Sequence, residues 1–393
     1  MKLSIKNPKI TLLFLAMISF SACQQNPSEI VQAGTSVEDD KTKKESYWVY
    51  VSSGGQEGSE IGIGIHEWDI NTGILAAVRG VNTVATSSYL ALDAEKERLY
   101  SINGDGIQAF KINRETGGLD LLNQVENAGR GGCHLSISND HQFLLAAYYS
   151  SGSAASYALN EDGSIGEHVS VVQHQGSSVN QERQEGPHAH MILPAPVGNL
   201  VFVPDLGTDK VMAYQISDQG ELSPAPIPFA SLDPGYGPRH MVFHPNKQFA
   251  YVLAELTGNV VGFKFDPERG LSDKINDLST LPSDFTDFSK SADIHITSNG
   301  KYLYASNRGH NSLAVYAIDQ ESGVLSLLGT PSCGGDWPRA FEIDPSGDYI
   351  LVANKRSNAI SVQKISSSSG LFEAAGNVKT VGAPQCIRFL KRK

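Results

Sequence analysis

A short strand pattern recurs seven times between residues 88 and 390, and it constrains the fold more than any other feature of this chain. The first residues of the seven segments lie 45, 56, 50, 53, 47 and 46 residues apart. A repeat of this length with several strands in each unit is the signature of a β-propeller. The segments are SYLALD (88–93), CHLSIS (133–138), AHMILP (189–194), RHMVFH (239–244), ADIHIT (292–297), RAFEID (339–344) and QCIRFL (385–390).

Each of these segments is followed by further apolar, alternating runs that turn residues separate, which is typical of a four-stranded unit. The chain opens with three such runs at 47–51, 63–68 and 74–77, with no first strand before them. It closes with a lone first strand at 385–390. We therefore predict an all-β, seven-bladed β-propeller over residues 47–393, with four-stranded blades and the N-terminal blade closed by the C-terminal strand. Long amphipathic helices, which a TIM barrel or a Rossmann fold requires, are missing from the pattern.

The N-terminal segment has the pattern of an export signal. Basic residues precede an apolar stretch (10–20) that is too short to span a bilayer comfortably, and the sequence FSAC ends it at Cys23. This pattern predicts a lipoprotein signal peptide over 1–22, with Cys23 as the site of lipid attachment. The alternative is a secretory signal followed by a chance cysteine. Both predict export, and we expect a polar, flexible tether over 23–46 and a position in the bacterial cell envelope, periplasmic or surface-facing.

The net charge of −11 argues against nucleic acid or an anionic lipid surface as partner. We expect a monomer that binds a small molecule and touches the membrane only through its lipid anchor. Three cysteines remain after Cys23, namely Cys133, Cys333 and Cys386, so one disulfide at most can form. Metal-ligand spacings are missing, and we predict neither a metal nor a cofactor.

The repeat places several ionisable residues at one end of the central channel. In a propeller the first strand of each blade lines the channel, and its start lies beside the end of the antiparallel second strand. The first residues of the seven segments include Arg239 and Arg339, and the residues directly after a first residue include His134, His190 and His240. Sixteen residues after the first residues, at the end of the second strand, lie Asp205, Glu255, Arg308 and Lys355. A cluster of this kind is more often functional than structural.

Each of these residues also has a purely structural interpretation. His134 could bridge blades through hydrogen bonds, and an arginine that follows a proline could form an inter-blade ion pair. Glu255 is flanked by apolar residues and needs a cation, for which Arg239 or Arg308 is available. The sequence GPHAH (186–190) has the spacing of a metal-binding pair, but a third ligand is not evident.

The motifs GPRH (237–240), YASNRG (304–309) and PRAFEIDPSG (338–347), with VAN (352–354), resemble the bacterial seven-bladed lactonase family. That family includes the propeller-type 6-phosphogluconolactonases and is related to the fungal carboxy-muconate lactonizing enzyme. The resemblance covers residues 47–393. It implies a propeller enzyme, a carboxylic-ester hydrolase that opens a sugar lactone without a cofactor.

By motif, the resemblance places the proposed catalytic residues of the fungal relative on His190, Arg239, Glu255 and Arg308. We expect His190, aided by Glu255, to activate water, and the arginines to hold the anionic group and the oxyanion. A nucleophilic serine in a Gly-x-Ser-x-Gly elbow is missing. The expected substrate-binding residues are His134, His188, His240, Arg339, Lys355 and Asp205.

Two other functions stay open at this point. The first is a non-catalytic binding or scaffold propeller of the envelope that uses the same end of the channel, which we call the mouth, and the second is a cycloisomerase of the muconate type. The expected export departs from the family, because phosphogluconolactone is a cytoplasmic intermediate. A non-phosphorylated lactone is therefore an equal candidate. The polar insertion at 173–187 is either a lid over the mouth or a disordered loop, and we favour the loop.

Overall fold

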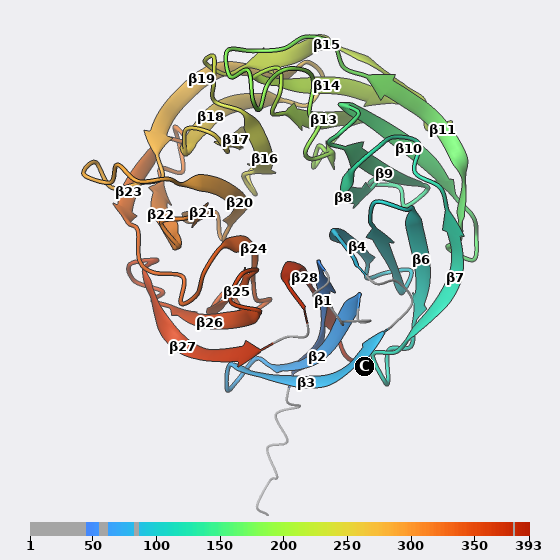
Figure 1. Ribbon diagram of the computed structural model, residues 1–393, viewed down its shortest axis with the longest axis vertical. Helices are drawn as coiled ribbons and strands as arrows, with labels where there is room; N and C mark the ends of the chain where they lie inside the picture. Colours follow the sequence, from blue (N-terminus) through green and yellow to red (C-terminus); the bar gives the residue numbers. More distant parts are fainter. Residues whose placement is uncertain (1–44, 55–61, 82–85, 380–381) are drawn as a thin grey trace, which may run out of the picture. The chain divides into compact units, whose positions relative to one another are not determined.

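The computed structural model describes residues 45–54, 62–81, 86–379 and 382–393, which form seven four-stranded antiparallel sheets arranged in a ring (Figure 1). The predicted signal peptide (1–22), Cys23 and nearly all of the predicted tether (23–46) lie outside the described residues. The seven-bladed, all-β architecture is confirmed. Within the described ranges there is no helix long and apolar enough to cross a membrane.

From the channel outward, the sheets consist of the following strands. They are β28 (Pro384–Lys391), β1 (Ser46–Ser53), β2 (Ile63–Asp69) and β3 (Ile74–Val81); β4 (Tyr89–Asp93), β5 (Arg98–Ile102), β6 (Ile107–Ile112) and β7 (Leu119–Val125); β8 (Gly132–Ile137), β9 (Phe143–Tyr148), β10 (Ser153–Leu159) and β11 (Ile165–Gln173); β12 (Leu193–Pro194), β13 (Leu200–Asp205), β14 (Lys210–Ile216) and β15 (Leu222–Ser231); β16 (Pro238–Phe243), β17 (Phe249–Ala254), β18 (Asn259–Asp266) and β19 (Gly270–Ser279); β20 (Lys290–Ile296), β21 (Tyr302–Arg308), β22 (Ser312–Ile318) and β23 (Leu325–Gly329); and β24 (Pro338–Ile343), β25 (Tyr349–Asn354), β26 (Ala359–Ile365) and β27 (Phe372–Lys379).

The two ends of the propeller meet in one blade, as the sequence predicts. The C-terminal strand β28 pairs with β1 in an antiparallel register that sets Trp48 opposite Leu390 and Tyr50 opposite Arg388. Without β28, strand β1 would be an unpaired inner edge facing the channel. The pairing joins the first and last parts of the chain and closes the ring.

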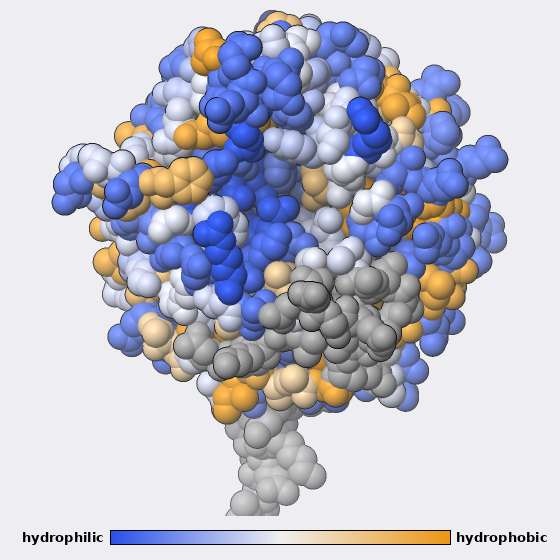
Figure 2. Space-filling model, in the orientation of Figure 1, coloured by the Kyte–Doolittle hydropathy of each residue, from blue (hydrophilic) through white to orange (hydrophobic). Residues whose placement is uncertain are grey.

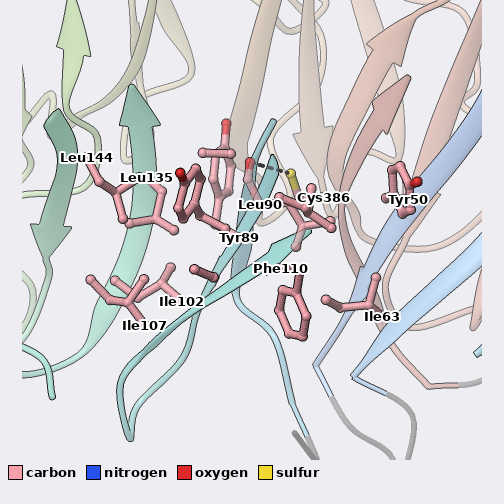
Figure 3. Close-up of a cluster of buried hydrophobic side chains, with 14 of the residues drawn as sticks. Tyr50, Ile63, Tyr89, Leu90, Ile102, Ile107, Phe110, Leu135, Leu144 and Cys386 are labelled. Atoms are coloured by element: carbon pink, nitrogen blue, oxygen red, sulfur yellow. Dashed lines mark hydrogen bonds between the residues drawn. The ribbon is translucent and has the colours of Figure 1, made fainter. Parts of the chain in front are cut away.

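The hydrophobic core lies between neighbouring blades. Figure 3 shows one such cluster, in which Tyr50 and Ile63 of the first blade, Leu90 and Phe110 of the next, and Leu135 of the third pack together. These side chains are almost completely buried. Each blade buries both of its faces, one against each neighbouring blade. The orientation of each inner strand therefore follows from its packing on both neighbours.

Three inner strands, β8, β16 and β24, carry a β-bulge near their first residues. The register against the second strand shifts between Gly132 and His134, between Pro238 and His240, and between Pro338 and Ala340. A bulge inserts one extra residue and re-aims its side chain. The bulged positions are Cys133, Arg239 and Arg339, so their side chains do not follow the simple alternation of an ideal strand.

One inner strand is much shorter than predicted. Of the expected strand at 189–194, only β12 (Leu193–Pro194) pairs regularly, and Ala189 forms an isolated bridge with Asp205. The partner strand contains Pro204, which has no N–H to donate to the ladder. The backbone N–H of His188 instead donates to the Asp205 carboxylate at 2.8 Å. A side chain thus replaces part of the backbone ladder at this position.

Trp68 of β2 connects the closing blade to the blade before it. It is fully buried, its Nε1–H donates to Asp344 Oδ2 at 3.2 Å, and its ring meets Tyr349 and Phe389 edge to face. We predict that Trp68→Ala lowers the free energy of unfolding by about 3–5 kcal/mol, because it leaves a large cavity at the closure and removes one hydrogen bond to the buried Asp344 carboxylate.

Urea unfolding of the two proteins measures this effect. The matched control is Ile74→Ala in the same blade, where the side chain is exposed, and we expect a change within about 0.5 kcal/mol. Equal effects of the two substitutions would contradict a special role of this interface.

Candidate active site

A cavity of about 440 Å³ opens where the inner strands begin. Figure 2 shows a hydrophilic hollow at the centre of the ring. The cavity is lined by Ser88, Gly104, Gly131, Gly132, Cys133, Tyr149, Ser150, Arg183, His190, Glu255, Arg308 and Arg339. His190, Glu255, Arg308 and Arg339 are among the residues that the repeat predicts for this mouth.

Glu255 is the electrostatic centre of the cavity. Its Oε2 accepts from Arg239 Nε at 3.1 Å and pairs with Arg308 Nη2 at 2.9 Å, and its Oε1 accepts from Arg183 Nη2 at 2.8 Å. Burial alone would raise the pKa of this carboxyl, but the guanidinium groups of Arg308, Arg239 and Arg183 outweigh burial and hold its pKa at about 2. Glu255 is therefore a permanent carboxylate.

Arg239 and Arg308 are also anchored to backbone carbonyls of strand β20, which belongs to the neighbouring blade for Arg239 and to the same blade for Arg308. Arg239 Nη1 donates to the carbonyl of Ala292, and Arg308 donates through Nε to Lys290 O at 3.2 Å and through Nη2 to Ser291 O at 2.9 Å. Burial lowers the pKa of Arg308 to about 10, and the Glu255 carboxylate opposes that fall. Both side chains thus have fixed orientations before any ligand arrives.

Arg183 is a site residue that the repeat analysis missed. It comes from the insertion at 173–187 and also donates to the Tyr149 hydroxyl at 3.1 Å. The insertion is ordered, because buried Gln184 donates to Leu206 O at 2.9 Å and to Asp209 Oδ1 at 2.8 Å. Our expectation of a disordered loop was wrong. An insertion has no repeat position, so only its contacts could reveal that an arginine from it reaches Glu255.

Arg339 differs from the other three arginines. It lines the cavity but makes no hydrogen bond or ion pair with any residue in the described part of the chain. Burial, followed by the charge of Arg308, lowers the pKa of its guanidinium. Lys355 does not line the cavity. Burial and the charges of Arg339 and Arg308 lower the pKa of its ammonium group. Among the described residues, the mouth therefore carries several cations and a single lining carboxylate, so it favours an anionic group.

His190 lines the cavity as a neutral base. Burial, followed by the charges of Arg239, His240 and Arg339, lowers the pKa of its imidazole well below 6.5. The ring has no carboxylate partner among the described residues, and its Nδ1 makes no hydrogen bond there. A neutral imidazole surrounded by cations is able to accept a proton as soon as negative charge enters the cavity.

His134 and His240 lie deeper in the channel than expected. Their ring centroids are 5.6 Å apart. The His134 ring lies 4.1 Å from the Tyr89 ring at an interplanar angle of 33°, and His240 Nδ1 bonds to Asp293 Oδ1 at 2.8 Å. Neither lines the cavity, and His134 lines a second hollow of about 590 Å³ near the other ends of the inner strands. A β-bulge shifts the register directly before each histidine. We had expected both to bind substrate there.

Asp205 and His188 do not line the cavity either. Asp205 is fully buried, and its carboxylate bonds to the His174 ring and to the N–H groups of His188 and Gly207. His188 stacks against Tyr149 with ring centroids 4.4 Å apart, and its Nε2 contacts Glu185 at 3.2 Å. These contacts shape the turns that support Tyr149, which does line the cavity.

The described residues hold no cluster of three or more His, Cys, Asp or Glu side chains suited to a metal ion. The three cysteines in the described ranges are free thiols. Cys133 lines the cavity, but burial raises the pKa of its thiol to about 12. It is therefore not a thiolate nucleophile at neutral pH.

Residues 49–389 match the family described as lactonase, 7-bladed beta-propeller. The chain belongs to this lactonase family. It is 37% identical over 304 residues to the 6-phosphogluconolactonase of Bacillus subtilis, covering 76% of this chain and 86% of that protein. It is 32% identical over 303 residues to the 6-phosphogluconolactonase of Formosa agariphila, covering 72% and 83%. The solved structure of a periplasmic gluconolactonase of Pseudomonas aeruginosa superposes with a TM-score of 0.83 at 29% identity, covering 88% of this chain and 99% of that one.

Membership in the lactonase family confirms the resemblance seen in the sequence motifs and makes the protein a hydrolase of lactone esters. Among the described residues, the cavity brings together a neutral imidazole (His190), a guanidinium without a hydrogen-bond or ion-pair partner (Arg339) and a buried carboxylate (Glu255). The scaffold alternative, which needs no such cavity, is not favoured by these findings.

Replacing Glu255 tests whether its charge holds the arginines together. We predict that Glu255→Gln lowers the free energy of unfolding by about 3–5 kcal/mol, because it leaves buried guanidinium groups without a counter-charge. Urea unfolding at neutral pH measures the change. Glu185→Gln, whose side chain is mostly exposed, is the control and should change stability by less than about 1 kcal/mol. A loss that small for Glu255→Gln would show that the arginines do not depend on this carboxylate.

The buried neutral histidines predict a pH dependence of stability. Burial lowers the pKa of His240 to about 4 and that of His134 and His190 well below 6.5. The unfolded chain takes up a proton at each of them near pH 6.5, whereas the folded chain does not. Their contribution to stability is therefore complete above pH 6.5 and is lost as the pH falls, by about 1.4 kcal/mol per unit for each histidine.

Urea unfolding between pH 7 and 5 measures this slope in the wild type and in His134→Phe, which keeps a ring against Tyr89 but cannot titrate. We expect the slope to decrease by about 1.4 kcal/mol per pH unit in the variant. An unchanged slope would mean that His134 is protonated in the folded protein.

Proposed function

We propose that the protein hydrolyses an aldonolactone outside the cytoplasm, with water activated by His190 and the developing oxyanion held by Arg339. The observation that carries this proposal is the pairing, in one cavity, of a neutral histidine with a guanidinium that has no hydrogen-bond or ion-pair partner among the described residues. Ester hydrolysis needs these two groups: a base for water and a cation for the oxygen that gains charge.

In this mechanism a ring nitrogen of His190 removes a proton from water as the water oxygen adds to the lactone carbonyl carbon. The carbonyl oxygen becomes an oxyanion that Arg339 stabilises. The bond between the carbonyl carbon and the ring oxygen then breaks, and the proton on His190 passes to that oxygen, which becomes a hydroxyl group. The carboxylic acid so formed releases its proton to solvent, and the product carboxylate lies among the arginines, which favour it electrostatically.

Glu255 acts in this scheme as a positioning residue. Three guanidinium groups already occupy its oxygens, and its pKa of about 2 makes it a weak base. Its part is to hold Arg239 and Arg308 at fixed orientations, so that the field in the cavity needs no reorganisation during the reaction. This differs from the direct assistance to water that we expected for Glu255 from the sequence.

The place of action follows from the N-terminal pattern, which supports export and lipid attachment at Cys23. The periplasmic gluconolactonase of Pseudomonas aeruginosa, which is similar over most of the chain, supports the same location. A non-phosphorylated aldonolactone is therefore the preferred substrate. The likeness to 6-phosphogluconolactonases supports the phosphorylated lactone as the comparison substrate.

Turnover of gluconolactone and of its 6-phosphate, corrected for spontaneous opening, tests this function. We expect His190→Ala to lower kcat by at least about a hundredfold, the usual effect of losing a general base. His168→Ala on the outer strand β11, where the histidine is exposed, should leave kcat unchanged. Unaltered kcat in His190→Ala would remove His190 from the mechanism, and failure of the wild type to open either lactone would contradict the proposed substrate class.

A further inference from the structure

Two aromatic side chains lie beside the mouth and have no part in the hydrolysis proposed above. Phe288 is 61% exposed, and its ring is nearly parallel to that of Trp337, with a centroid distance of 6.3 Å and an interplanar angle of 12°. Cations flank both rings: Lys290 Nζ is 5.3 Å from the Phe288 centroid, and the Arg356 guanidinium is 3.4 Å from that of Trp337. We call this pair of rings the aromatic platform.

The aromatic platform is contiguous with the cavity through Arg308. The Arg308 guanidinium, which lines the cavity, is 5.5 Å from the Trp337 ring centroid. On the other side, Ser289 Oγ donates to Arg308 O at 3.3 Å, so the segment that carries Phe288 packs against the same arginine. A ligand in the cavity that extends past Arg308 would therefore reach the platform.

The backbone holds Trp337 in an unusual conformation. Its φ is +66°, in the left-handed region that bulky side chains rarely adopt. Its N–H donates to Asn311 Oδ1 at 2.9 Å, and its carbonyl accepts from the N–H of Lys355 at 3.0 Å. Backbone strain of this kind persists where surrounding contacts enforce it, and it gathers at ligand sites.

We infer that the aromatic platform is a subsite for a second sugar ring, so that the substrate class is the lactone of a disaccharide oxidised at its reducing end. This inference rests on the proposed lactone hydrolysis. The lactone ring occupies the cavity next to His190 and Arg339, and the linked pyranose lies with its apolar C–H face on Phe288 and Trp337. The electron-rich face of an aromatic ring attracts the slightly positive hydrogens of such a C–H face.

The groups around the platform suit a hydroxylated ring, which can both donate and accept hydrogen bonds. Asp336 directly precedes Trp337, and its Oδ1 accepts from Asn311 Nδ2 at 2.9 Å. Sugar hydroxyls can donate to this carboxylate. The cations on the rings provide further contacts for hydroxyl oxygens.

The test compares kcat/KM for gluconolactone with that for cellobionolactone, its glucosyl derivative, using the full-length protein. In the wild type we expect a preference of roughly five- to tenfold for the disaccharide lactone, the size of one aromatic stacking contact. Phe288→Ala should abolish this preference and leave gluconolactone turnover within about twofold of the wild-type value, because the side chain is exposed and outside the cavity lining.

Phe229→Ala is the matched control. Phe229 is also exposed and has a lysine over its ring, with Lys210 Nζ 4.5 Å from the centroid, but it lies on the outer strand β15. We expect it to retain the wild-type preference. Equal kcat/KM for the two lactones in the wild type, or an equal loss with both lactones in Phe288→Ala, would overturn the inference while leaving the lactonase proposal intact.

A binding measurement decides the inference even if the wild type opens neither lactone. Calorimetry with cellobionate and gluconate, the corresponding open acids, should show tighter binding of cellobionate by the same factor in the wild type. That difference should disappear in Phe288→Ala. Equal affinities of the wild type for the two acids would overturn the subsite.

Discussion

The pairing of β28 with β1 is the interaction on which the rest of the structure depends. It joins the first and last parts of the chain, and each blade can then bury both faces against neighbours. Closure also makes the inner strands begin around one opening. Side chains from distant parts of the sequence, such as His190, Glu255 and Arg339, reach one cavity only because the ring is closed.

Within that opening, one carboxylate makes a dense set of cations possible. Four arginines near one another would repel, and burial would add to the cost. Glu255 binds three of them and leaves Arg339 without a partner among the described residues. Arg183, Arg239 and Arg308 are therefore held in place and give the cavity a fixed electrostatic field, whereas Arg339 is available to a ligand. Fixed charges of this kind need no reorganisation when an oxyanion forms.

Periodicity predicted the blades, their number and the closing strand because strand alternation and turn residues are local properties. It also placed His190, Glu255, Arg308 and Arg339 at one mouth. His134 and His240, for which it also predicted substrate contacts, do not line the cavity, and each follows a bulge that shifts the strand register. Asp205 was also misassigned: its carboxylate completes backbone hydrogen bonds beside Pro204, a use that spacing does not reveal.

The sequence by itself determined the seven-bladed ring, the family and most of the residues at the mouth, because each follows from a repeated local pattern or a motif. The tertiary structure decided what those residues do. Only there does Arg183 reach Glu255 from an insertion, and only there do Phe288 and Trp337 meet beside Arg308. Hydrogen-bond partners and burial depend on contacts between segments far apart in the chain, and these set both the pKa of His190 and the availability of Arg339.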